Sequence, residues 1–254
     1  MAIEEKAKVV FCGRRKDKGQ AVQQAIQDAS GQALFVQADV LKVADIERVF
    51  QVAKDTYGGV DIAIPNAGIE GNPTSNIMSE GFMDNYRRVM DVNLDSIVNT
   101  SRVAVSYLEK NPHTGFLFVY SSVAAPGMAA YCMAKAACDA LVRCLAAETP
   151  DAVQVYSFNP YTIDSELSRR VLGLFGVSLD DWARDHNPSG KVGTGQDIGK
   201  LIADTCKGKY QNEYPSGSNL LTDGRVLFHA REAGVLAGMW GTSEFKQLVE
   251  KHGI

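Results

Sequence analysis

The sequence predicts an α/β protein built on a doubly wound parallel sheet, with helices packed on both of its faces in three layers. Short apolar runs rich in Val, Ile and Phe alternate with longer amphipathic segments along the chain, which is typical of parallel sheets. The strand runs are continuously apolar, as expected where both faces of a sheet are covered. The chain has 254 residues, of which 45% are hydrophobic, so one domain over residues 1–254 is expected.

Strands and helices are predicted in strict alternation. The expected strands are the short apolar runs at 8–12, 33–37, 61–65, 115–120, 153–159 and 219–222. The expected helices are the amphipathic stretches at 19–30, 43–57, 79–110, 130–147 and 196–206. Two regions, 164–187 and 224–254, break the alternation, and each is expected to cover a ligand crevice or a partner surface.

Charge and composition exclude several classes of protein. The 26 basic and 30 acidic residues give a net charge of -4 without a dense basic run, so nucleic acid is not an expected partner. No stretch is long and apolar enough to span a bilayer, and residues 2–8 are too charged for a signal peptide. The five cysteines lack metal-ligand spacing, which predicts reduced thiols and no metal. A soluble, cytoplasmic protein is expected.

Tyr131 and Lys135 form the central candidate site. They stand four residues apart at the start of a helical pattern, so both side chains lie on one helix face and can meet over one pocket. A neighbouring ammonium stabilises a phenolate, which lowers the tyrosine pKa from about 10 towards neutrality and allows proton exchange with a substrate. Taken alone, the pair is explained equally well as a solvated helix face.

Polar residues elsewhere in the sequence favour the site interpretation. Ser121 and Ser122 directly follow one strand run, Asn66-Ala67-Gly68 follows another, and Asn93 lies in the long helical pattern. The carboxyl ends of parallel strands form the ligand crevice of an open α/β sheet. We therefore expect these groups to converge at one edge of the sheet.

These motifs resemble those of the short-chain dehydrogenase/reductase family, which has a Rossmann-like fold, and the resemblance runs from residue 7 to residue 224. Five segments carry it in the family's order: Pro65-Asn66-Ala67-Gly68, Asp91-Val92-Asn93, Tyr120-Ser121-Ser122, Tyr131-Cys132-Met133-Ala134-Lys135 and Asn159-Pro160-Tyr161-Thr162-Ile163. Pro65 replaces the first asparagine of the family's Asn-Asn-Ala-Gly motif, and Tyr161 replaces the glycine of its Asn-Pro-Gly segment.

The resemblance implies a role for each of four residues. Tyr131 is expected to act as general acid/base, and Ser122 to hydrogen-bond the substrate oxygen. Lys135 is expected to lower the tyrosine pKa and bind the nicotinamide ribose, while Asn93 holds a water that connects Lys135 to solvent. The implied cofactor contacts, besides Tyr131 and Lys135, are Asn66, Ala67, Gly68, Pro160 and Ile163, with Asp39 and Val40 beside the adenine ring.

The turn after the first strand run indicates which cofactor is bound. Arg14 and Arg15 stand where an acidic residue would otherwise accept from the ribose 2′-hydroxyl. Arginine can clamp a 2′-phosphate, so NADP(H) is favoured over NAD(H). A solvated basic turn explains the two arginines equally well, and an ordinary helix cap explains Asp39.

The start of the chain departs from the family pattern. Family members begin with a strand, a glycine-rich turn and a helix, which are not found before 8–12; residues 2–7 resemble the last turn of that helix. Without a central first strand, two half-sheets with unpaired backbone groups and weak dinucleotide binding are expected. Three explanations stay open, in this order: a truncated form of a longer protein, replacement of the strand by another segment or subunit, or a fold that has abandoned the cofactor.

The loop before Tyr131 is a second departure. Ser122 precedes Tyr131 by nine residues, about four fewer than is usual in the family. The loop is shortened where substrate would lie, so Ser121 is a second candidate for the serine role.

The leading prediction is an NADP(H)-dependent oxidoreductase that interconverts a secondary alcohol and a ketone on a small or medium organic substrate. The alternative is a catalytically silent relative that serves as a binding or assembly module. The resemblance also implies a homodimer or homotetramer formed through the two long helices. Apolar positions on these helices could serve that interface or simply face the sheet: Val98, Val103, Val105, Cys138 and Leu141.

Overall fold

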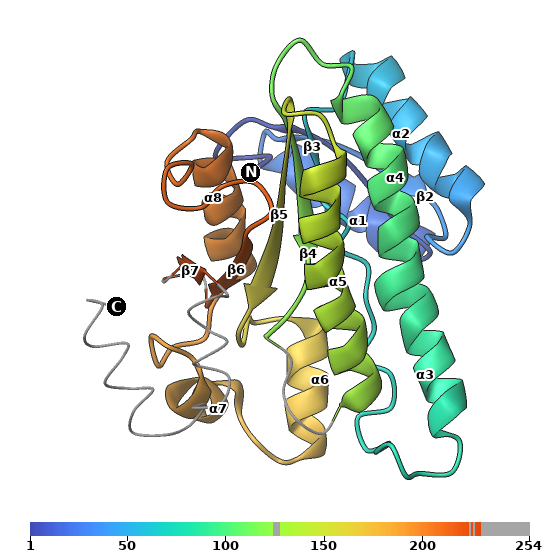
Figure 1. The fold of residues 1–254 in the computed structure, drawn as a ribbon, viewed down its shortest axis with the longest axis vertical. Coiled ribbons are helices and arrows are strands. Elements are labelled where there is room, and N and C mark those ends of the chain that lie inside the picture. The colour runs from blue at the N-terminus through green and yellow to red at the C-terminus, as the bar shows by residue number, and fades with distance from the viewer. Residues whose placement is uncertain (124–127, 224, 226, 230–254) are drawn as a thin grey trace.

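The chain folds as a Rossmann-like α/β structure with helices on both faces of a parallel sheet (Figure 1). A computed structural model describes residues 1–123, 128–223, 225 and 227–229. Of these, residues 228 and 229 are described by their backbone alone. Most of the tail that the sequence singles out, 224–254, therefore lies outside the described residues. No described helix is long and apolar enough to cross a membrane, and the described residues contain no disulfide.

The strands form two separate sheets. The larger has the order β3-β4-β5-β6-β7, in which the first four strands are parallel and β7 is antiparallel to β6. Its strands are β3 (Ile62–Ala63), β4 (Gly115–Tyr120), β5 (Val153–Pro160), β6 (Asn219–Thr222) and β7 (Leu227–His229). The smaller is the parallel pair of β1 (Lys8–Gly13) and β2 (Gln32–Gln37). β1 and β3 are thus both edge strands in the described structure, as expected for two half-sheets.

Helices cover the two faces of the larger sheet. One face packs against α2 (Val43–Tyr57), α4 (Ser96–Leu108) and α5 (Ala129–Glu148), and the other against α8 (Gly195–Cys206). α1 (Lys16–Asp28) packs on β2, where Gly19 leaves room for the ring of Phe35.

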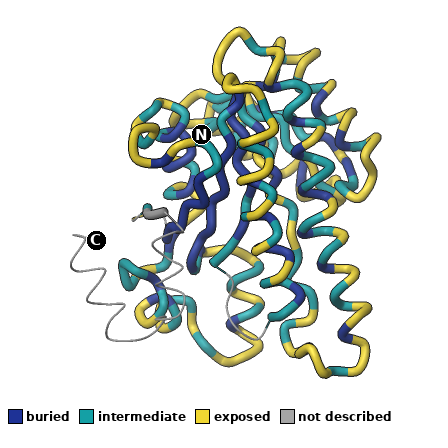
Figure 2. The backbone as a smooth tube through the Cα atoms, in the orientation of Figure 1, coloured by how far each residue is buried: buried dark blue, intermediate teal, exposed yellow. Residues whose placement is uncertain are grey.

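The central strands are buried along most of their length (Figure 2), and their side chains belong alternately to two apolar cores. In β4, Leu117 and Val119 pack with α2, α4 and α5, while Phe116 and Phe118 pack with Ile198 and its neighbours on α8. A strand buried on both faces has no polar side, which explains why this run is continuously apolar in the sequence.

The single long helix predicted at 79–110 is divided into three parts. α3 (Phe82–Met90) begins after Gly81. The backbone of Gly81 is left-handed, with φ of 75°, so a right-handed helix that started at Ser79 could not continue through it. A π-helical turn, η1 (Asp91–Asp95), then joins α3 to α4. Turns of this kind are rare and frequently occur at functional sites.

The region 164–187, predicted only as a break in the alternation, contains two short helices. These are α6 (Glu166–Leu174) and α7 (Leu179–His186). Ser165 and Ser178 cap them, since their hydroxyls accept from backbone N–H groups three residues later. A serine before each segment could have indicated these two helix starts, but the prediction relied on the apolar pattern alone.

The shortest strand, β3, illustrates a limit of strand prediction. A strand was expected at 61–65, but only Ile62 and Ala63 are regular. The run still pairs with β4 through two carbonyl groups, those of Asp61 and Pro65, which accept from Phe116 and Tyr120. Pro65 has no N–H to donate, so the ladder ends there.

Four of the apolar positions considered for a subunit interface contact the core of the sheet. Cys138 is fully buried in the core beneath α5, and Val103, Val105 and Leu141 pack against the same core. For Cys138 the sheet-facing interpretation is confirmed, while the other three residues contact the core and keep part of their surface exposed.

Candidate active site

The predicted site residues lie where the strands end. Ser122 follows β4, Gly68 follows β3, and Pro160 ends β5, while Tyr131 and Lys135 occupy the first turns of α5. In Figure 1, β5 points towards the end of the molecule where α6 lies, so the site occupies that end of the sheet. This is the crevice that an open parallel sheet presents to ligands.

Ser122 and Tyr131 are joined by a side-chain hydrogen bond. Burial raises the pKa of Tyr131 above its ordinary value, and the bond with Ser122 only partly opposes the increase. The phenol is therefore protonated at neutral pH. The expected depression of this pKa by Lys135 is absent here, because the energetic cost of burying a phenolate dominates.

Lys135 is buried, with only 3% of its surface exposed. Its Nζ donates to the carbonyl of Tyr120 at 2.7 Å and lies 5.8 Å from the centroid of the Tyr131 ring. Burial lowers the pKa of Lys135, whereas the neighbouring Cys138 and Asp139 raise it. Tyr131 and Lys135 thus share one side of α5, as the four-residue spacing predicts.

The two serines have different surroundings. Ser121 is buried and its hydroxyl donates to the backbone carbonyl of Lys135 at 2.9 Å. Ser122 is partly exposed and contacts Tyr131. The shortened loop does not prevent this contact, and its residues 124–127 lie outside the described residues.

Asn93 sits in the π-helical turn and holds the segment after β3. Its Oδ1 accepts from the Ile69 N–H and its Nδ2 donates to the Ile69 carbonyl, both at 2.8 Å. The backbone carbonyl of Asn93 accepts from the thiol of Cys138 at 3.2 Å. Within the π-turn, the Asn93 side chain is thus directed at Ile69 and its backbone carbonyl at Cys138 of α5.

Gly68 lies close to both Asn93 and Lys135. A Cβ atom at this position would be 3.6 Å from Asn93 Oδ1 and 3.8 Å from Lys135 Nζ. Gly68 thus lies beside the lysine ammonium, which keeps donors besides the one given to Tyr120 and could donate to a ligand hydroxyl.

The smaller sheet carries the residues predicted to bind the adenine end of a cofactor. Arg14 and Arg15 follow β1 and are exposed, and neither forms an ion pair with another described residue. Gln37 Nε2 donates to the Arg14 carbonyl, which ties this turn to the end of β2. The two guanidinium groups are therefore available to an anionic ligand.

Asp39 and Val40 follow β2, as predicted, but the Asp39 carboxylate has a local structural role. Its Oδ1 accepts from the N–H of Leu41, and its own N–H donates to Asp45. Only the position of Asp39 and Val40, just after β2, therefore agrees with the expected contact to an adenine ring.

The segment after β5 departs most from the family pattern. Tyr161, in place of glycine, is 8% exposed, and burial raises its pKa. Asn187 binds both backbone groups of Thr162, and Ile163 is buried beside Gly193. The side chain of Ile163 therefore belongs to the core, so its backbone is the part that could meet a cofactor.

An ion pair across the crevice was not predicted from the sequence. Arg170 of α6 binds Glu70, two residues after Gly68, at 2.6 Å. The Glu70 carboxylate is near enough to Tyr131 to raise the phenol pKa further. A single acidic residue two positions after the glycine of the motif was the available signal.

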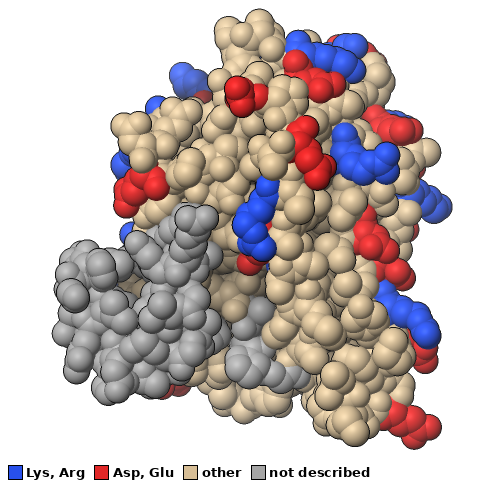
Figure 3. Space-filling model, in the orientation of Figure 1, with Lys and Arg blue, Asp and Glu red and all other residues tan. Residues whose placement is uncertain are grey.

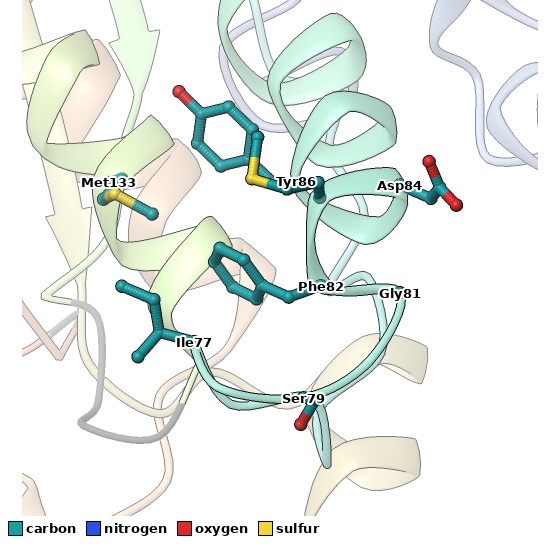
Figure 4. A pocket seen from close by; sticks show the side chains of 8 residues that line it. Ile77, Ser79, Gly81, Phe82, Asp84, Tyr86 and Met133 are labelled. Carbon is teal, nitrogen blue, oxygen red and sulfur yellow. The ribbon is translucent and has the colours of Figure 1, made fainter.

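A hollow of about 640 Å³ lies apart from these residues, between the start of α3 and α5 (Figure 4). Ile77, Phe82, Tyr86 and Met133 converge around it. Tyr131 does not line it. On the face shown in Figure 3, acidic and basic side chains are interspersed among the residues drawn in colour.

Comparisons with known proteins identify the family. A family model described as enoyl-(acyl carrier protein) reductase matches residues 1–224. The 3β-hydroxysteroid dehydrogenase of Mediterraneibacter gnavus is 29% identical over 208 residues, covering 76% of this chain and 74% of the relative. The 3β-hydroxysteroid dehydrogenase 1 of Eggerthella lenta is 30% identical over 214 residues, covering 81% and 78%.

Solved structures show the same fold. A 3-oxoacyl-(acyl-carrier protein) reductase from Brucella melitensis in complex with NAD superposes with a TM-score of 0.75 at 23% identity, covering 88% of each chain. A short-chain type dehydrogenase/reductase from Mycobacterium marinum gives 0.74 at 24% identity, covering 86% of this chain and 85% of that one. The chain belongs to the short-chain dehydrogenase/reductase family of oxidoreductases.

Proposed function

We propose that this protein is an NADP(H)-dependent oxidoreductase that interconverts a secondary alcohol and a ketone, with Tyr131 as general acid/base. The observation that carries the proposal is the convergence of Ser122, Tyr131 and Lys135 at the carboxyl end of β4 and the start of α5. A hydroxyl, a phenol and an ammonium in this arrangement can bind a carbonyl oxygen and protonate it.

The mechanism follows from what each side chain can donate. Ser122 and Tyr131 hydrogen-bond the substrate oxygen and hold the carbonyl carbon in place. When bound, the reduced nicotinamide supplies the hydride that this carbon accepts. Tyr131 Oη gives its proton to the oxygen as the alcohol forms, and Lys135 stabilises the phenolate that remains. In oxidation the same proton returns to Tyr131.

Asn93 supports this step indirectly. Its two side-chain bonds to Ile69 fix the backbone beside Gly68, against which Lys135 Nζ lies. In the proposed mechanism Asn93 thus holds the backbone that lies beside Lys135, and this position suits the proton-refilling role that the family resemblance implies.

The preference for NADP(H) is supported by Arg14 and Arg15. Both are exposed after β1 and, within the described part of the chain, neither is used by an ion pair. A phosphate there would gain charge-assisted hydrogen bonds. Lys135 would hold the ribose hydroxyls, and the backbone of Asn66, Ala67 and Gly68 would lie along the cofactor.

The substrate is proposed to be a small or medium organic alcohol or ketone. The two relatives named above are called 3β-hydroxysteroid dehydrogenases, and an apolar secondary alcohol of that kind suits the chemistry of Tyr131. We further propose a homodimer or homotetramer that acts in the cytoplasm, in keeping with the lack of disulfides in the described residues.

The test combines binding and turnover. NADPH fluorescence is titrated with the purified chain, and NADPH oxidation is followed with a panel of ketones. Tyr131→Phe is expected to lower kcat by at least about a thousandfold while the NADPH Kd changes by less than about threefold. Tyr57→Phe, at the far end of α2, is the matched control. Full turnover by Tyr131→Phe would refute the mechanism, and saturable binding without turnover would support the binding-module alternative.

A further inference from the structure

The segment that follows β5 leaves the sheet but keeps a strand-like pair of hydrogen bonds. The pairing of β5 with β6 ends at Pro160, opposite Thr222, two residues before Thr162. The N–H of Thr162 donates to Oδ1 of Asn187, and its carbonyl accepts from Nδ2 of the same side chain, both at 3.0 Å. Two residues of an antiparallel ladder exchange bonds in this way. The side-chain amide of Asn187 thus replaces a partner strand for one residue, and the proposed mechanism does not use it.

The Asn187 amide is buried and fully bonded. Only 5% of the residue is exposed, and Nδ2 also donates to the Lys191 carbonyl at 2.7 Å, so both of its hydrogens are used. Its own N–H donates to the Ala183 carbonyl at the end of α7, and its own carbonyl accepts from the N–H of Gly190. A reversed amide would place nitrogen against the Thr162 N–H and oxygen against two carbonyls. The contacts therefore define one orientation of the side chain.

A second segment pairs with the same stretch of chain. The N–H of Gly193 donates to the Thr162 carbonyl at 3.1 Å, and its carbonyl accepts from the N–H of Asp164 at 2.8 Å. These bonds form a parallel bridge between Ile163 and Gly193. In an extended stretch, the backbone groups of successive residues point to opposite sides. The N–H and carbonyl of Ile163 therefore point away from Gly193, and within the described part of the chain no hydrogen bond to them is found.

The arrangement at Asn187 repeats the one at Asn93. Asn93 bonds to the N–H and the carbonyl of Ile69, after β3, and is 0% exposed. Each of the two amides thus holds one residue beyond the end of a strand, where the ladder has stopped. β4, which is followed by Ser122, lies between β3 and β5 in the sheet. The two asparagines therefore hold the segments that follow the two strands on either side of β4.

We propose that Asn187 is a positioning residue for the cofactor. By fixing both backbone groups of Thr162, it directs the neighbouring N–H and carbonyl of Ile163 at the nicotinamide end of the dinucleotide. This role rests on the proposed function, because it requires a nicotinamide cofactor beside this segment. The hydrogen bonds between Asn187 and Thr162 do not depend on that function and are tested separately.

The first test is amide hydrogen exchange, followed residue by residue by NMR without any ligand. In the wild type, the Thr162 N–H should exchange at least about a hundredfold more slowly than an unprotected amide. Asn187→Ala should accelerate this exchange at least about tenfold, whereas the Ile69 N–H, which Asn93 holds, should stay within about twofold. Unprotected exchange of Thr162 in the wild type would overturn the proposal, even if the variant does not fold. So would an unchanged rate in Asn187→Ala.

The second test compares a whole cofactor with its adenine end. NADPH contains the nicotinamide, whereas 2′,5′-ADP does not. Asn187→Ala, studied well below its Tm, is expected to raise the NADPH Kd by about threefold to tenfold and to lower kcat about tenfold. The Kd of 2′,5′-ADP, measured by calorimetry, and the KM for the ketone should stay within about twofold.

The two ligands also separate the possible failures. Equal rises of both Kd values, or an unchanged kcat and NADPH Kd, would overturn the positioning role. A wild-type chain that binds no NADPH would refute the proposed function and with it the cofactor role, while the exchange rates would still decide whether Asn187 holds Thr162.

Two further variants complete the comparison. Asn187→Asp keeps the size and the acceptor for the Thr162 N–H, but an ionised carboxylate has no hydrogen for the carbonyls of Thr162 and Lys191. Its kcat at neutral pH should therefore be no higher than that of Asn187→Ala, and full kcat would overturn the role. The matched control is Asn111→Ala, because Asn111 Nδ2 donates to the Val60 carbonyl at the opposite end of the sheet. Its kcat and both Kd values should stay within about twofold of wild type.

Discussion

Arg170 and Glu70 form an ion pair that connects α6 to the segment after β3 at a distance of 2.6 Å. The Glu70 side chain is 12% exposed and that of Arg170 is 54% exposed, so a largely buried carboxylate meets a guanidinium at the surface. The two residues are 100 positions apart in the sequence (170 minus 70), yet their contact joins α6 to a carboxylate that also acts electrostatically on Tyr131.

Breaking this pair should weaken substrate binding more than catalysis. Glu70→Gln is expected to raise KM by about threefold to tenfold with little change in kcat, because α6 is no longer held across the crevice. The double variant Glu70→Arg/Arg170→Glu should recover part of the loss. Arg169→Gln, which breaks an ion pair with Asp164 beside the same helix, is the control. An unchanged KM in Glu70→Gln would contradict this role.

The two arginines after β1 should discriminate between cofactors. Replacing both, Arg14→Ala/Arg15→Ala, is expected to raise the NADPH Kd by roughly 10- to 100-fold, since a 2′-phosphate loses charge-assisted hydrogen bonds. The NADH Kd should stay within about twofold. Fluorescence titration with both cofactors measures the two constants, with Lys18→Ala as the control. An equal rise of the NADPH Kd and the NADH Kd would mean that the two arginines do not bind the 2′-phosphate.

The raised pKa of Tyr131 predicts a simple pH dependence for reduction. A general acid must be protonated, and burial keeps the phenol protonated at neutral pH. The kcat/KM for ketone reduction should therefore be flat through neutral pH and fall only above about pH 10, the ordinary tyrosine pKa. A fall centred near pH 7 would show that bound cofactor and Lys135 lower the pKa far more than burial raises it.

Gly19 should tolerate no side chain. A Cβ atom there would lie 2.2 Å from the ring of Phe35, so Gly19→Ala forces either the Phe35 ring or α1 to move. The expected loss is about 1–3 kcal/mol of unfolding free energy. Gly173→Ala is the control, because nothing lies within 4 Å of the added atom and the helix should gain up to about 1 kcal/mol. Denaturant unfolding compares the two, and equal stabilities would contradict the packing argument.

Local sequence signals predicted most of the fold. The boundaries of α2, β4 and β6 match the predicted residues because their apolar patterns are continuous and end at polar residues or turns. The helix at 79–110 was predicted as one unit, since a left-handed Gly81 and a π-turn leave the apolar periodicity almost unchanged.

The site was predictable to the extent that its residues follow one another in motifs. The four-residue spacing of Tyr131 and Lys135 sets their shared helix face, and the structure brings Ser122 to the phenol. The Tyr131 pKa could not be predicted, because it depends on burial by distant elements. The ion pair of Glu70 and Arg170 could not be predicted either, because the sequence around one residue does not indicate that the other is its partner.

The division between β1 and β3 has a consequence for ligand binding. Arg14 and Arg15 belong to the two-stranded unit, while Tyr131 and Lys135 belong to the five-stranded one. A dinucleotide bound at both ends would connect the two sheets, which are not joined by backbone hydrogen bonds between strands. Part of its binding energy would then be spent on immobilising one unit against the other, so affinity and rigidity should rise together. Amide hydrogen exchange in β1 and β3 would slow on ligation more than in β4 or β5.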